Sequence, residues 1–133
     1  MTLVSVMLSP PLYGADRTIT VMANRTCKTW IDDRAKREAV DRSIYDWFPA
    51  ATSEHWLLGL LTGLNAGTDI DVNLLNDVDS QLVFDWMDKY CKEHPDQDVY
   101  NGAEELVLDL VKMKIREECL RRAASAGKTC KTN

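Results

Sequence analysis

Four cysteines carry the most definite chemistry in this 133-residue sequence. They are Cys27, Cys91, Cys119 and Cys130. An even number of cysteines in a small chain is typical of a disulfide framework, and four cysteines allow three pairings. We favour Cys27 with Cys91, which would tie two helices together, and Cys119 with Cys130, which would close a short C-terminal loop.

A metal site or a cysteine nucleophile is the alternative use of these residues. Cys91 and His94 have a Cys-x-x-His spacing, which would place two metal ligands, or a thiol and its base, on one turn of a helix. The sequence has no CxxC, its other histidine is His55, and it contains no glycine-rich phosphate loop. An oxidised Cys91 could fill neither role. We therefore expect a protein without catalytic residues, metal ligands or a cofactor.

Acidic residues cluster between residues 67 and 79. They are Asp69, Asp71, Asp77 and Asp79. A calcium loop of the EF-hand type would need a glycine at its turn and a glutamate at its twelfth position, and this segment has neither. We interpret it as an acidic loop between helices and as the partner-binding surface, because charge complementarity speeds encounter and rejects wrong partners.

The composition predicts a single folded domain that binds protein. Hydrophobic residues make up 45% of the chain and charged residues 28%, which supplies enough apolar surface for one core. A formal net charge of -5 argues against a nucleic-acid partner, since binding to phosphates depends on clustered Lys and Arg. We place the helical domain at residues 16–122 and a C-terminal tail at residues 123–133.

Residues 1–15 resemble the end of a secretory signal peptide. They carry no charge, hold an apolar run at residues 3–8 and then reach Pro10-Pro11 and Gly14-Ala15. We expect a truncated signal peptide here and a periplasmic or secreted protein, with an ordered N-terminal strand or tail as the alternative. No run reaches the roughly 18 apolar residues of a membrane span, so no stable membrane insertion is expected.

Hydrophobic periodicity predicts an all-α fold, a small bundle of four to five helices stapled by disulfides. The first helix is expected over residues 26–42, with Cys27, Trp30, Ile31 and Arg34 on one face and a charged, solvated face opposite. Residues 44–48 are aromatic and precede Pro49, so we interpret them as a loop. Ser53 is the expected N-cap of a helix over residues 54–65, which is apolar nearly all round and should be central.

The second, third and fourth helices show further sequence signals for packing and for their ends. Gly59 and Gly63 suggest that a neighbour packs closely on the central helix. The third helix should begin near Asp77 or Asp79 and end before Pro95, and the fourth should run from Asp98 or Asn101 to Cys119 or Arg122, with Asn101 and Glu104 in capping-box spacing. Their expected core faces hold Leu82, Val83, Trp86, Met87, Tyr90 and Cys91 in the third helix, and Ala103, Leu106, Val107, Leu110 and Val111 in the fourth. The tail should be mobile unless Cys130 anchors it.

The segment from about Trp56 to Val111 resembles the Tai family of small exported immunity proteins, which neutralise amidase effectors of type VI secretion. The resemblance rests on the helix over residues 56–63 and on Gln81, Tyr90, His94-Pro95, Ala103 and Leu106-Val107. It implies that the protein occludes the active-site cleft of a periplasmic peptidoglycan amidase, as a homodimer, and does not act as an enzyme.

A second resemblance is to small periplasmic acid-stress chaperones of the HdeA type. Its residues are Cys27 and Trp30 in the first helix and Trp86, Tyr90 and Cys91 in the third. The implied function is the alternative one: carboxylates neutralised at low pH would loosen a dimer or the fold and expose apolar faces to unfolding clients.

Overall fold

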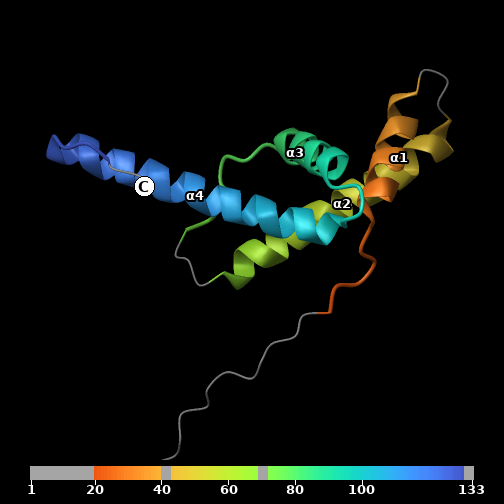
Figure 1. The fold of residues 1–133 in the computed structure, drawn as a ribbon, viewed down its shortest axis with the longest axis horizontal. Helices are drawn as coiled ribbons and strands as arrows, with labels where there is room; N and C mark the ends of the chain where they lie inside the picture. The colour runs from red at the N-terminus through yellow and green to blue at the C-terminus, as the bar shows by residue number, and fades with distance from the viewer. Residues whose placement is uncertain (1–19, 40–42, 69–71, 131–133) are drawn as a thin grey trace, which may run out of the picture.

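The computed structural model describes residues 20–39, 43–68 and 72–130, and this part of the chain contains four helices and no strand (Figure 1). The helices are α1 (Cys27–Glu38), α2 (Ile44–Gly67), α3 (Ser80–Glu93) and α4 (Val99–Ala126). The prediction of an all-α bundle stapled by disulfides is confirmed. The expected signal peptide at residues 1–15 lies outside the described residues.

The four helices enclose one core. Both α1 and α4 pack against α2 and α3. Trp30 of α1, Leu57 of α2 and Met87 of α3 are completely buried where these helices meet. The expected core faces of α3 and α4 are confirmed apart from Leu82, which is exposed because the face that meets the core begins at Val83.

Each helix begins at a residue whose side chain caps it. The N-caps are Thr26, Ser43, Asp79 and Asp98, and each accepts a hydrogen bond from a backbone N–H of the first turn. The start predicted for α3 at Asp79 is confirmed. The capping box expected at Asn101 and Glu104 was wrong, because Asp98 accepts the bond from the Asn101 N–H at 2.9 Å.

The start of α2 also differs from the prediction. Ser43 and Asp46 form a reciprocal capping box, so residues 44–48 are helical and not a loop. Pro49 lies inside the helix, where its missing N–H removes one bond to the carbonyl of the fourth residue before it. The helix continues because the turn after Pro49 packs into the protein, with Ala50 and Ser53 buried.

Ser53 is therefore an interior residue of α2 and not its N-cap. Its hydroxyl donates to the Asp33 carboxylate of α1 at 3.2 Å. The close packing expected at Gly59 and Gly63 was also wrong, since a Cβ at either position would meet nothing within 4 Å. The tightly packed glycine is Gly102 of α4, where a Cβ would lie 2.7 Å from Met87 Sδ and 2.8 Å from Tyr90 Cδ1.

Both predicted disulfides are present. Cys27–Cys91 joins α1 to α3 in the core, with 4.7 Å between the Cα atoms. A short backbone pairing lies beside it, in which the Cys27 N–H donates to the Gln97 carbonyl at 3.0 Å and the Val99 N–H to the Arg25 carbonyl at 2.8 Å. Cys119–Cys130 draws the segment after α4 back onto that helix.

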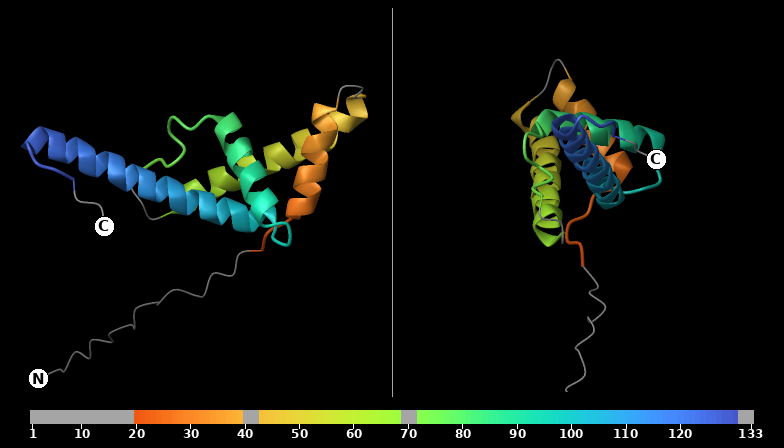
Figure 2. Two further views of the ribbon diagram at one scale, coloured as in Figure 1. Left: turned by 45° about the horizontal axis from the view of Figure 1, so that its top comes forward. Right: turned by 90° about the vertical axis from the view of Figure 1, so that its left-hand side faces the viewer.

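The last part of α4 projects beyond the other helices (Figures 1 and 2). We call residues 112–130 the C-terminal arm. The helix extends to Ala126, beyond its predicted end, and stops at Gly127, whose φ of 61° is a left-handed conformation that favours glycine. Cys130 holds the arm's last residues, so the anchored form of the predicted tail is the one observed.

Candidate functional site

Cys91 and the two histidines form neither a metal site nor a cysteine nucleophile with its base. Cys91 is bonded to Cys27, which removes the thiol that the metal or nucleophile alternative required. His94 follows α3 and its ring lies against Tyr90, with 4.7 Å between the ring centroids. His55 is on the exposed side of α2, its Nδ1 2.7 Å from the Ala51 carbonyl oxygen. Within the described ranges, no group of three or more His, Cys, Asp or Glu residues could hold a metal ion.

The acidic residues predicted to bind a partner are only partly described. Asp69 and Asp71 lie outside the described residues. Asp77 is exposed in a turn, with a φ of 63°, and its carboxylate accepts from the Asn76 amide. Asp79 caps α3 and accepts from the Gln81 N–H at 2.6 Å. Asp77 and Asp79 thus have local structural roles that do not exclude contact with a partner.

A buried ionic network joins three helices, and the sequence did not predict it. The guanidinium of Arg34 in α1 donates to Glu54 of α2 at 2.6 Å and to Asp88 of α3 at 3.0 Å. Trp30 Nε1 donates to the same Asp88 carboxylate at 2.7 Å, and Arg37 donates to Glu54. The network joins α1, α2 and α3.

The network keeps Arg34 charged. Burial by itself would lower the pKa of Arg34, but the hydrogen bonds and negative charges of Asp88 and Glu54 outweigh burial and raise it. The Arg34 guanidinium also lies 5.8 Å from the centroid of the Phe84 ring. The charge of Arg34 is thus paired with one carboxylate from α2 and one from α3.

The first turns of α2 carry exposed apolar side chains, which we call the aromatic patch: Ile44, Tyr45, Trp47 and Phe48. Tyr45 is 83% exposed, and the rings of Trp47 and Phe48 meet edge to face with centroids 6.2 Å apart. Large aromatic side chains exposed together are typical of surfaces that bind other proteins. The sequence showed these aromatic residues, but the expected loop gave no reason for them to share a surface.

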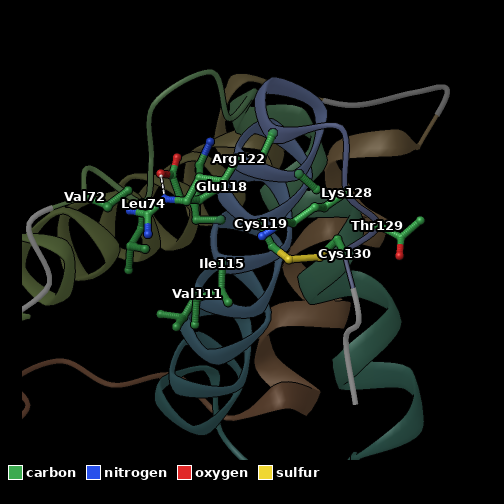
Figure 3. A pocket seen from close by; sticks show the side chains of 13 residues that line it. Val72, Leu74, Val111, Ile115, Glu118, Cys119, Arg122, Lys128, Thr129 and Cys130 are labelled. Atoms are coloured by element: carbon green, nitrogen blue, oxygen red, sulfur yellow. Dashed lines mark hydrogen bonds and ion pairs between the residues drawn. A yellow bond between two sulfur atoms is a disulfide. The ribbon is translucent and has the colours of Figure 1, made fainter.

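An apolar groove of about 700 Å³ lies along the C-terminal arm (Figure 3). Its walls are α4, the segment 72–74 and the segment 128–130 that the Cys119–Cys130 disulfide holds in place. The apolar residues that line it are Val72, Leu74, Val111, Ile115, Ala123 and Ala126.

The charged residues of the groove differ in their partners. Arg122 Nε donates to Glu118 at 2.6 Å, and hydrogen bonds from Arg121 and Arg122 lower the pKa of Glu118. Lys114 donates to the Asn76 carbonyl at 3.4 Å and to Glu117 at 3.3 Å. The side chain of Lys128 makes no hydrogen bond or ion pair with any residue that the structure describes.

The chain matches no known protein family, no curated protein and no solved structure. Among the described residues, no helix has the length and apolar character needed to cross a membrane.

Proposed function

We propose that this protein is exported to the periplasm and inhibits another protein by binding it, in the manner of immunity proteins against peptidoglycan amidase effectors. The observation that carries this proposal is the aromatic patch on α2, which is exposed on a rigid, disulfide-stapled bundle. The two disulfides fit an oxidising compartment.

The aromatic patch has the composition of a binding hot spot. Tyr and Trp provide large contact areas and lose little conformational entropy when they are fixed at an interface. The patch belongs to a helix whose start is capped by Ser43 and Asp46 and whose following turns are joined to α1 through Glu54. A partner would therefore meet a surface that is already ordered, which reduces the entropic cost of binding.

The charge of the protein favours a partner with a basic surface around its target site. The formal net charge is -5, and residues 112–130 hold six Lys or Arg against two Glu, so the remainder of the chain is strongly acidic. Asp77 and Asp79 are exposed on that acidic remainder. Complementary charge would speed the encounter with a basic rim around an amidase cleft.

A pull-down with a matched pair of variants tests the proposal. The oxidised protein is used as bait in periplasmic extract at neutral pH, and captured proteins are identified by mass spectrometry. We expect one stoichiometric partner with amidase activity that the bait inhibits. Phe48→Ala should weaken this complex about tenfold or more, whereas Leu82→Ala, which removes an equally exposed side chain from α3, should not. Absence of a stoichiometric partner, or equal binding by both variants, would refute the proposal.

The ionic network favours one alternative, an acid-activated chaperone. In that function, loss of the contacts that Glu54 and Asp88 make with Arg34 would loosen three helices at once. The same bait tested at about pH 3 would then capture many unfolding proteins and suppress their aggregation. A protein that stays compact at that pH and captures no clients would exclude this function.

A further inference from the structure

We propose that the groove along the C-terminal arm is a binding site for an anionic amphiphile, a single apolar chain that ends in a carboxylate. The inference does not rest on the proposed function. The groove lies at the end of α4, whereas the aromatic patch lies at the start of α2, at the opposite end of the molecule (Figure 1).

The shape of the groove suits a small molecule better than a macromolecule. Its volume of about 700 Å³ is within the range of ligand pockets, which are roughly 300 to 1,000 Å³. It is bounded on three sides, by α4, by the segment 72–74 and by the segment 128–130. A groove lined by three parts of the chain fits a narrow apolar chain better than a partner helix.

Aliphatic and methyl groups line most of the groove. Val111 and Ile115 lie toward one end of it in Figure 3, and the nearby Lys114 directs its ammonium to the Asn76 carbonyl and to Glu117. Ile115 is 63% exposed although it belongs to this lining, so its apolar surface faces water. An apolar chain lying here would remove that surface from water.

Positive charge is concentrated at the other end of the groove. Arg122 and Lys128 both line the groove beyond Cys119, with Arg122 beside Glu118 in Figure 3. Arg122 is paired with Glu118, whereas Lys128 has no partner among the described residues. A carboxylate bound at this end would give the Lys128 ammonium an ionic partner, with the attached chain directed toward Ile115.

The wall formed by residues 128–130 depends on a covalent bond. The Cys119–Cys130 disulfide holds this segment across the last turns of α4, and Gly127 turns the chain back toward the helix. Within the part of the chain that the structure describes, the backbone hydrogen bonds that would still restrain the segment without the disulfide are those from the Gly127 and Lys128 N–H groups. Binding of the amphiphile should therefore require an intact Cys119–Cys130 bond.

Fluorescence titration with dansyl-labelled undecanoic acid tests the site on the full-length oxidised protein. We expect saturable binding that dodecanoate displaces and dodecanol displaces much less well. Ile115→Glu should weaken binding about tenfold or more, because it places a charge in the apolar groove. Leu120→Glu makes the same change at an exposed residue of the same helix that does not line the groove, and should leave binding unchanged.

A second pair of variants tests the position of the carboxylate. Lys128→Glu should weaken binding of the labelled acid severalfold, while Lys112→Glu, on the outer surface of the same arm, should not. Cys119→Ser with Cys130→Ser should also weaken binding.

Three results would overturn the proposal. They are the absence of saturable binding, equal losses for Ile115→Glu and Leu120→Glu, and displacement of the probe by an acidic amphipathic peptide but not by dodecanoate. The last result would assign the groove to a protein segment instead.

Discussion

Arg34 is the residue through which α1, α2 and α3 are joined by charge. Its guanidinium contacts one carboxylate from α2 and one from α3, and its side chain is 10% exposed. The periodicity of the first helix puts Arg34 on the same face as Trp30, but predicts that the surrounding charges are solvated. Its partners are 20 and 54 residues away along the chain, and local periodicity holds no information about contacts over such distances.

Loss of this guanidinium should destabilise the fold. Arg34→Leu leaves Glu54 and Asp88 in a largely buried site without their main cation, so the free energy of unfolding should fall by about 3 to 5 kcal/mol. Urea denaturation followed by tryptophan fluorescence measures this. Arg37→Leu should cost clearly less, because the Arg37 side chain is 41% exposed. Similar losses for both variants would show that Arg34 is not the centre of the network.

The capping box at the start of α2 gives that helix end a pH dependence. The backbone hydrogen bond from Ser43 lowers the pKa of Asp46, so the ionised carboxylate stabilises the helix start at neutral pH. This stabilisation is lost as the pH falls through the lowered pKa. We expect Cα chemical shifts at residues 44–47 to lose helical character in acid. Asp46→Asn should abolish this transition, and an identical transition in that variant would contradict the assignment.

At the scale of the helices, the contact between α3 and α4 depends on the absence of a side chain at Gly102. Met87 and Tyr90 occupy the space that a Cβ would take, and Met87 is completely buried. The sequence indicated where α3 begins, where α2 ends and which faces of α3 and α4 are buried, because caps and periodicity are local signals. It indicated the wrong glycines for close packing, because that depends on which helix lies opposite.

Two glycine substitutions should therefore have opposite effects. Gly102→Ala should reduce the free energy of unfolding by about 1 to 3 kcal/mol, since its Cβ would overlap Met87 and Tyr90. Gly59→Ala should increase it by roughly 0.5 to 1 kcal/mol, since the position is open and alanine favours a helix. Thermal denaturation of the two variants compares them directly. Equal destabilisation would mean that α2 has a close neighbour at Gly59 after all.

At the scale of the whole molecule, the two disulfides stabilise different parts. Cys27–Cys91 closes a sequence separation of 64 around α1, α2 and α3, whereas Cys119–Cys130 closes a separation of 11 on the arm. Both pairings could be predicted from the sequence, because the first fits two core-facing helices and the second a short loop. The groove and the aromatic patch could not, because the first needs the fold of the arm and the second needs residues 44–48 to be helical.

Removal of each disulfide should separate these roles. Cys27→Ala with Cys91→Ala should cost about 4 kcal/mol on chain-entropy grounds and lower the melting temperature of the bundle. Cys119→Ser with Cys130→Ser should leave the near-ultraviolet circular dichroism of the bundle, where Trp30 is buried, nearly unchanged. A large drop in the bundle's melting temperature for the second variant would show that the arm supports the core.

The core disulfide also determines how far the molecule can be stretched. At no more than about 3.6 Å per residue, the 64-residue separation corresponds to roughly 230 Å of chain that pulling on the two ends cannot release while Cys27–Cys91 is intact. Under force, the oxidised protein would extend only outside the two loops that the disulfides close, and would keep the covalent loop from Cys27 to Cys91. Such a chain cannot pass through a narrow pore as a single extended thread. Any threading across a membrane must therefore precede formation of this bond.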